Sequence, residues 1–299
     1  MSSTNAWFQL LRLSNTPTIL SNALVGLGLA IAANRLQWED VTIAPYFSPL
    51  RTLCYISFAI LCAYLGGIVL NDVVDLNYDK QHRADRPIPQ GIISKKQATI
   101  VGITLLAFAI AFAFKTQLLA GLLMVLLVSF VLAYTFFHRA LISSLLCMGV
   151  CRGLTYLVAF TAFDVHFQAL PLLVFAGGIG WYTAALTYIA REEATNKKKR
   201  AWLVLLVLPA FIVPAVLFYS PYHALWMMFA WIGCIALLST TIVMFLLFEK
   251  PVHGIHALLA GFCILDMFYL VIIGEVTIAV LSGLCLLITI AFQQKIPGT

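Results

Sequence analysis

Residues 118–137 read LLAGLLMVLLVSFVLAYTFF, twenty consecutive positions without a charged side chain. An α-helix rises about 1.5 Å per residue, so this stretch can cross a bilayer core about 30 Å thick. The stretch shows none of the alternation of apolar and polar residues that a membrane-barrel strand requires. It therefore predicts a transmembrane helix, and the class of the chain depends on how many others accompany it.

The composition of the whole chain is that of a membrane protein. Of its 299 residues, 62% are hydrophobic and 10% are charged, and the mean hydropathy is +0.99. Soluble domains carry about 45–50% apolar and about 25% charged residues, which excludes an ordinary soluble enzyme and a disordered chain. The net charge of +6 comes from basic residues scattered over short loops, so no nucleic-acid partner is expected. The seven cysteines lie in apolar stretches without a CxxC pair, which is typical of small buried hydrophobic residues.

Ten segments are apolar enough to be spanning helices. They cover residues 17–33, 53–70, 98–114, 118–137, 141–162, 170–189, 201–218, 225–248, 255–273 and 276–292. Little more than Gly274 and Glu275 separates the last two, so the count stays at nine or ten. The sequence predicts an all-α polytopic transmembrane bundle that forms a single domain over residues 1–299 in the lipid bilayer.

Basic residues predict the orientation of this bundle. With ten spans, fourteen of the eighteen Lys and Arg residues fall on the side of the N-terminus, three on the other side, and Arg152 inside a span. Cytoplasmic loops carry the excess of Lys and Arg. We therefore expect a multi-pass protein of the cell (inner) membrane with a cytoplasmic N-terminus. The polar loops 71–97 and 190–200 would both be cytoplasmic.

The first of these loops opens with an acidic motif, Asn71-Asp72-Val73-Val74-Asp75-Leu76-Asn77-Tyr78-Asp79. Asp72, Asp75 and Asp79 are spaced i, i+3, i+7, which places them on one face of a helix continuing the second span. Carboxylates held together need a cation, and hard oxygen ligands open to water suit Mg²⁺. Asn71, spaced i, i+4, i+8 with Asp75 and Asp79, would complete the ligand set. The alternative interpretation is a solvated acidic loop.

Two arginines, Arg83 and Arg86, follow the motif directly. A guanidinium fork matches phosphate oxygens bidentately, so acids that hold Mg²⁺ beside these arginines would form a diphosphate clamp. The alternative is that both arginines only anchor the positive side of the membrane protein.

The chain resembles the UbiA family of membrane prenyltransferases. Its first aspartate-rich motif, NDxxDxxxD followed by RxxRP, fits Asn71, Asp72, Asp75, Asp79, Arg83, Arg86 and Pro87. The likeness includes the entry to the first span at residues 13–18 and the stretch of residues 134–139. The resemblance implies a helical bundle around a central cavity open to the cytoplasmic side. It also implies Mg²⁺-dependent transfer of an isoprenoid chain from a prenyl diphosphate to an aromatic or other acceptor. Tyr134, His138 and Arg139 would then contact the substrate, Arg139 at its phosphates.

Two positions depart from the family pattern. The second family motif, DxxxD, is reduced to the adjacent acids Glu192 and Glu193, which cannot both line one helical face. They would contribute metal ligands, or alternatively pair with the basic residues 197–200. His138 stands where the family stretch YPxxKR has Lys, which removes a permanent positive charge near the phosphates. This pattern is most similar to the EboC branch of UbiA-like proteins.

Arg152 and Asp266 are ionisable residues near the middle of predicted spans. Because an unpaired charge in the membrane is costly, we expect them to pair. The pair would either fix helix packing or place Arg152 on an anionic group of the acceptor.

The sequence thus predicts a membrane prenyltransferase. Asp72, Asp75 and Asp79 would be the catalytic acids, assisted by Mg²⁺ and arginines that stabilise the departing diphosphate. The alternative, favoured by the weak second motif, is a non-catalytic scaffold or carrier for a lipid or natural-product precursor.

Overall fold

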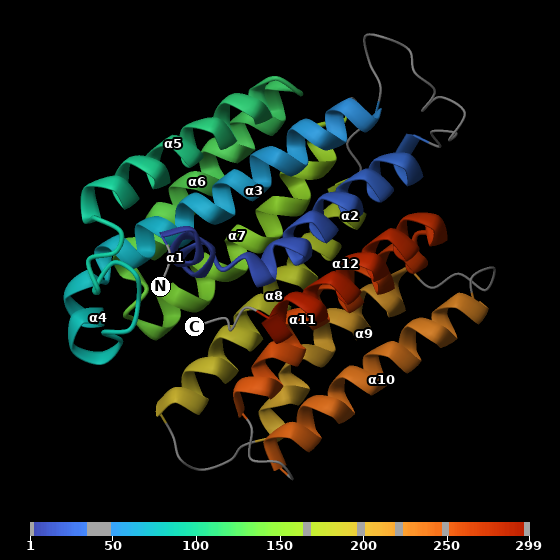
Figure 1. The fold of residues 1–299 in the computed structure, drawn as a ribbon. Helices are drawn as coiled ribbons and strands as arrows, with labels where there is room; N and C mark the ends of the chain where they lie inside the picture. Colours follow the sequence, from blue (N-terminus) through green and yellow to red (C-terminus); the bar gives the residue numbers. More distant parts are fainter. Residues whose placement is uncertain are drawn as a thin grey trace.

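The computed structural model describes residues 3–34, 49–163, 169–195, 201–218, 224–246 and 251–295, and this part of the chain is helical and contains no strand (Figure 1). The helices, η denoting 3₁₀ helix, are α1 Ser3–Leu10, η1 Leu13–Asn15, α2 Thr16–Asn34, α3 Pro49–Val74, α4 Leu76–His82, α5 Lys95–Phe114, α6 Leu118–Phe137, α7 Leu141–Thr161, α8 Ala169–Thr195, η3 Ala201–Val207, α9 Leu208–Leu217, α10 Ala224–Leu246, α11 Pro251–Ile272 and α12 Val276–Lys295. The prediction of an all-α membrane bundle is confirmed.

Nine helices in the described ranges have the length and apolar character to cross a membrane. The last two predicted spans are separate helices, α11 and α12, because the chain turns at Gly274 with a φ of 87°. The predicted span over residues 201–218 is different, since it is a 3₁₀ segment followed by a short α-helix. At about 2.0 Å per 3₁₀ residue and about 1.5 Å per α-helical residue, the two pieces together still approach the thickness of the bilayer core.

Prolines explain why this tenth segment is irregular. Pro214 has no N–H, so the carbonyl of Ala210, four residues earlier, loses its helical partner. The hydroxyl of Tyr269 in α11 donates to that carbonyl at 2.8 Å. The indole N–H of Trp181 in α8 donates to the carbonyl of Leu206, also at 2.8 Å. Neighbouring helices therefore satisfy backbone groups that the broken helix cannot satisfy itself.

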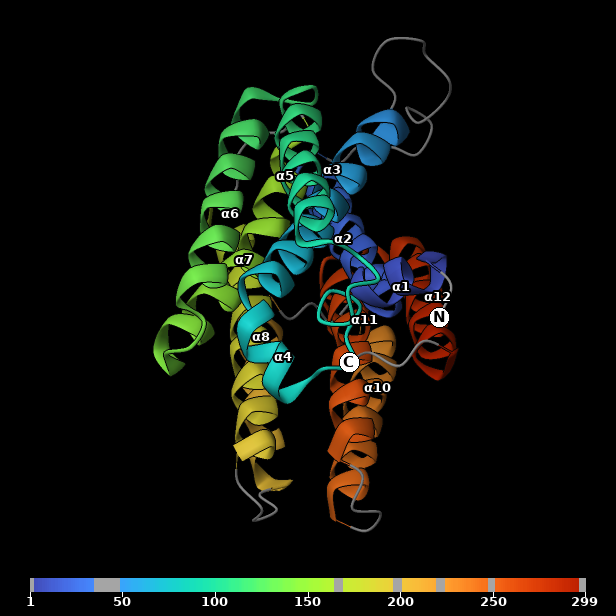
Figure 2. The same cartoon turned by 60° about the vertical axis from the view of Figure 1, so that its left-hand side comes forward.

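Helix α2 lies in the middle of the bundle. It packs against α3, α7, α11 and α12, and it is the most buried of the nine candidate spans. Figure 2 shows α5 and α6 on one flank of the molecule and α12 on the other. These outer helices expose large apolar side chains such as Ile103, Leu118 and Leu287, which is the surface expected to face lipid acyl chains.

Small residues allow α7 and α8 to approach closely. A Cβ atom on Gly149 would lie 2.8 Å from the carbonyl oxygen of Gly180, and one on Gly153 would lie 2.9 Å from that of Ala176. Membrane helices associate largely through such close packing, since lipid removes the hydrophobic driving force between them.

A small apolar cluster, separate from the main core, fixes the segments around the C-terminal end of α3. Ala6 and Leu10 of α1 pack with Val69 and Val73 of α3, together with Ile88 and Ile93 of the loop before α5. Ser94 then starts α5 with a capping box, accepting from the backbone N–H of Gln97 while the Gln97 side chain accepts from Ser94. The cluster holds α1 and this loop beside the acidic motif.

Candidate functional site

The acidic motif lies where α3 ends and α4 begins, as the sequence predicts. The helix bends at Asp75, yet the backbone bonds from Asp75 to Asn71 and from Asp79 to Asp75 continue at 2.9 and 2.8 Å. Two successive turns of hydrogen bonding therefore carry the motif past the end of the membrane helix and keep Asp72 and Asp79 on a common side.

One arginine joins the first and last acids of the motif. Nη1 of Arg86 lies 3.2 Å from Asp72 Oδ1 and 2.8 Å from Asp79 Oδ2. All three side chains are buried, with Asp72, Asp79 and Arg86 exposing 6%, 1% and 4% of their surface. A carboxylate–guanidinium cluster at this depth is only moderately screened by water, so it places strong local charges of both signs together.

A second arginine, which the sequence analysis did not single out, comes from the N-terminal segment. Nη2 of Arg12 lies 3.1 Å from Asp72 Oδ1. The backbone of Arg12 is left-handed, with a φ of 45°, the one positive φ among the described residues other than glycine. The turn between α1 and η1 therefore directs this side chain onto the motif.

Asp75 has different partners from the other two acids. Its Oδ1 lies 3.2 Å from His138 Nε2, and its Oδ2 accepts from Asn71 Nδ2 at 3.2 Å. Within the described ranges, no group of three or more His, Cys, Asp or Glu side chains is arranged to hold a metal ion. Without a cation the like charges repel, so Asp72 and Asp79 turn to Arg86 while Asp75 turns to His138 and Asn71. Metal binding by the three carboxylates stays a prediction.

Five buried side-chain N or O atoms in the described part of the chain have no hydrogen-bond partner. They are Gln9 Oε1, Ser14 Oγ, Asn71 Oδ1, Asp79 Oδ1 and Arg86 Nε. Gln9 and Ser14 belong to the N-terminal segment of Arg12, and Asn71 and Asp79 belong to the acidic motif. Arg86 contacts Asp72, as Arg12 does, so all five atoms lie on segments that meet at Asp72. Buried polar atoms are rarely left unpaired, and unpaired ones point to a missing ligand. The oxygens of Asn71 and Asp79 suit a hard cation, while the Arg86 N–H suits an anion.

The start of the second polar loop lies at the same end of the bundle as the acidic motif, as predicted. Arg191 of α8 donates to the carbonyl of His138 at 3.2 Å, to Ser144 Oγ at 3.0 Å, and to the carbonyl of Arg139. Arg191 therefore fastens the turn between α6 and α7, from which His138 reaches Asp75.

The remaining predicted site residues lie near the contact between His138 and Asp75 or directly after Arg191. The side chains of Arg83 and Arg139 are exposed, Tyr134 is half-buried, and its ring lies 5.6 Å from that of His138. Glu192 follows Arg191 and is half-buried. The side chain of Glu193 and the basic residues 197–200, its predicted alternative partners, lie outside the described residues.

The predicted pair of Arg152 and Asp266 is not a direct contact. Arg152 Nη1 donates to Asn22 Oδ1 at 2.6 Å, and Asn22 Nδ2 donates to Asp266 at 2.9 and 3.1 Å. The correction has a simple cause: the amide of Asn22 on α2 offers an acceptor to one ion and a donor to the other. Both ions lie in one region of the bundle, as the sequence predicts, whereas Asn22 was not among the predicted residues.

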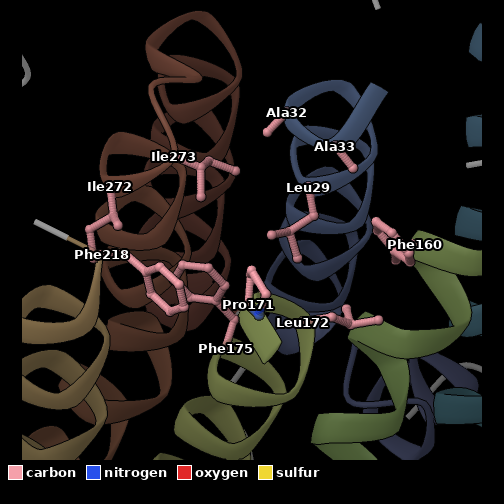
Figure 3. Close-up of a pocket in the computed structure, with 10 residues that line it drawn as sticks. All are labelled: Leu29, Ala32, Ala33, Phe160, Pro171, Leu172, Phe175, Phe218, Ile272 and Ile273. Atoms are coloured by element: carbon pink, nitrogen blue, oxygen red, sulfur yellow. The ribbon is translucent and has the colours of Figure 1, made fainter. Parts of the chain in front are cut away.

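A cavity of about 300 Å³ lies at the other end of the bundle (Figure 3). Its lining residues within the described ranges are all apolar and come from the ends of α2, α7, α9 and α11 and the start of α8, among them Leu29, Phe160, Phe175, Phe218 and Ile273. Helices α2 and α3 are consecutive and packed together, so the end of α2 lies opposite the end of α3 that carries Asp72. The expected cavity beside the acidic motif remains a prediction.

The chain matches the model of the UbiA prenyltransferase family over residues 24–296. It is 29% identical over 140 residues to 4-hydroxybenzoate octaprenyltransferase of Blochmanniella pennsylvanica, covering 44% of this chain and 48% of that one. It is 28% identical over 127 residues to digeranylgeranylglyceryl phosphate synthase of Sulfurisphaera tokodaii, covering 42% and 41%. The matched region thus spans about half the length of these relatives. A UbiA homologue from Archaeoglobus fulgidus, solved with GPP and Mg²⁺, has the same fold, with a TM-score of 0.55, 16% identity and coverage of 91% and 99%.

Proposed function

Because the chain belongs to the UbiA prenyltransferase family, we propose that it is a Mg²⁺-dependent enzyme that transfers an isoprenoid chain from a prenyl diphosphate to an acceptor. One observation carries this proposal. Buried oxygens of Asn71 and Asp79 and the buried Nε of Arg86 lack partners within a single cluster. A cation and an anion together satisfy both kinds of atom, and a magnesium diphosphate is such a combination.

The residues divide by charge in this proposal. Asn71, Asp72, Asp75 and Asp79 hold the metal, with Glu192 and Glu193 as further ligands from the second loop. Arg12, Arg83, Arg86 and Arg139 neutralise phosphate oxygens. Tyr134 and His138 line the site, since His138 already contacts Asp75 and its ring lies in a tilted contact with that of Tyr134. Bound Mg²⁺ supplies positive charge that stabilises the leaving diphosphate.

The protein contributes electrostatic preorganisation. Arg12 and Arg86 are held by Asp72 before substrate arrives, so little reorganisation is needed when negative charge grows on the leaving group. The surrounding helices exclude water, which strengthens these interactions and protects an allylic carbocation from hydrolysis. The acceptor then attacks the allylic carbon and loses its proton.

The chain is an integral multi-pass membrane protein. We propose that it lies in the cell (inner) membrane with the acidic motif facing the cytoplasm, because fourteen of its eighteen basic residues fall on that side. We also propose that residues 1–299 form one domain. The narrower likeness to the EboC branch stays a prediction.

A transfer assay in lipid tests the proposal. Purified protein receives radiolabelled geranyl, farnesyl or geranylgeranyl diphosphate, a panel of aromatic and lipid acceptors, and Mg²⁺ or EDTA. Asp79→Asn and Asp72→Asn are the test variants, and Asp85→Asn is the matched control because Asp85 is an exposed acid of the same loop. We expect Mg²⁺-dependent product in the wild type and Asp85→Asn, and its loss in both test variants.

The carrier alternative predicts a different result. Mg²⁺-dependent binding of the diphosphate without transfer to any acceptor would favour the non-catalytic carrier or scaffold. Absence of binding would contradict both, because each depends on the clamp at the acidic motif.

A further inference from the structure

A cluster of hydrogen-bonded polar side chains lies inside the bundle where α2, α7 and α11 meet. Arg152 of α7 donates to Asn22 Oδ1 at 2.6 Å and to Thr18 Oγ1 at 3.0 Å, both on α2. Asp266 of α11 accepts from Asn22 and from the hydroxyl of Tyr156. Charged groups at this depth are costly and are retained mainly for function or for pairing.

The two ions of this group are not equivalent. Asp266 is fully buried, and its two oxygens already accept three hydrogen bonds from Asn22 and Tyr156. Arg152 is only partly buried, and two of its five N–H groups are used within the described part of the chain. Its guanidinium also lies 4.1 Å from the centroid of the Phe262 ring, which fixes the plane of the fork.

The position of Arg152 relates it to the acidic motif. Arg12, which contacts Asp72, and Thr18, which contacts Arg152, are six residues apart along η1 and α2. At the usual rise of these helices the separation is about 10 Å. Tyr64 of α3 interacts electrostatically with both arginines, which places all three residues in one region of the bundle.

We propose that Arg152 binds an anionic group of the acceptor, a carboxylate or a phosphate, and that Asn22 and Thr18 position its guanidinium for this. Each oxyanion can accept two parallel N–H bonds from the fork. The inference rests on the proposed prenyl transfer, which supplies the second substrate. The names of two relatives contain acceptors or products with such groups, 4-hydroxybenzoate and a glyceryl phosphate.

Equilibrium binding in lipid nanodiscs tests this proposal independently of turnover. Two anionic probes are each compared with an uncharged analogue. 4-Hydroxybenzoate is compared with its amide, and geranylgeranylglyceryl phosphate with the alcohol that lacks the phosphate. Geranyl diphosphate and Mg²⁺ are present in every measurement. We expect one anion to bind better than its neutral partner. Arg152→Gln should weaken the binding of that anion roughly tenfold to a hundredfold and abolish the preference for it over the neutral analogue. Arg152→Lys should retain part of this preference. Which anion responds identifies the source of the group.

Two controls separate this role from packing and from the diphosphate site. Tyr156→Phe removes a bond to Asp266 without touching Arg152, so it should lower thermal stability and leave acceptor preference unchanged. Geranyl diphosphate binding, measured alone, should be the same in Arg152→Gln and the wild type. If Arg152→Gln weakens neutral and anionic probes equally, or if the wild type prefers neither anion, the proposal is wrong even where geranyl diphosphate binds. Failure of that donor binding in the wild type would overturn the proposed function instead.

Discussion

Arg152 and Asp266 are joined through the side-chain amide of Asn22, which accepts from the first and donates to the second. Two charges inside the membrane are thus compensated without direct contact. Replacing Asn22 breaks both links at once, so this neutral residue governs the stability of the ionic group.

Asn22→Leu should destabilise the protein strongly. Asp266 loses two of its three hydrogen bonds, and a buried polar group left unsatisfied costs about 1–3 kcal/mol, or more when charged. Thermal unfolding in detergent measures the effect. Asn77→Leu, the same change at an exposed position of α4, is the control and should unfold near the wild-type temperature. Equal unfolding temperatures for the two variants would contradict the role given to Asn22.

Arg86 and Arg83 should differ in their effect on stability. Arg86→Gln leaves Asp72 and Asp79 buried without their shared cation, and breaking a buried ion pair costs about 3–5 kcal/mol. Arg83 is exposed, so Arg83→Gln should weaken diphosphate binding with little change in stability. Unfolding curves and the KM for geranyl diphosphate separate these effects. An Arg86→Gln protein as stable as Arg83→Gln would show that the buried cluster is unimportant to the fold.

Tyr269→Phe tests the hydrogen bond that satisfies the Ala210 carbonyl in the proline-interrupted helix α9. The substitution removes the donor to the Ala210 carbonyl and should cost about 1 kcal/mol. Pro214→Ala restores an N–H that can bond the same carbonyl, so it should rescue much of the loss in the double variant. Additive effects of the two substitutions would mean that they act on different groups.

Gly153→Ala tests the close approach of α7 and α8. The added Cβ would lie 2.9 Å from the Ala176 carbonyl oxygen, and overpacking of this kind typically costs about 1–3 kcal/mol. Gly177→Ala is the matched control, because nothing lies within 4 Å of a Cβ at that position of α8. We expect only Gly153→Ala to lower the unfolding temperature. The opposite order would contradict the packing described.

The membrane helices and the acidic motif could be predicted because each depends on local sequence. Uninterrupted apolar stretches fix α6, and the spacing of Asp72 and Asp79 correctly predicts that they share a side. The 3₁₀ segment before α9 was missed because hydropathy averages over Pro209 and Pro214, although both are visible in the sequence.

Contacts between distant segments could not be predicted in the same way. Arg12 was not among the predicted site residues, yet it is the one charged residue among the first 34, a signal that could have identified it. Thr18, Ser21 and Asn22 share one face of α2 at spacings of three and four, but sequence alone does not show which helix that face meets.

The central place of α2 has a consequence for biosynthesis. Asn22 bonds Arg152 and Asp266, which follow it by 130 and 244 residues in the chain. Ser21 bonds Ser282, which follows it by 261 residues. At about 5–20 residues per second, the ribosome needs roughly 13–50 s to make that last partner. Arg152 is made about halfway through this interval, and the polar face of the first membrane helix lacks Asp266 until close to its end. A chain that stops before α11 leaves Asn22 without Asp266 and Ser21 without Ser282, which gives cellular quality control a means of recognising incomplete copies.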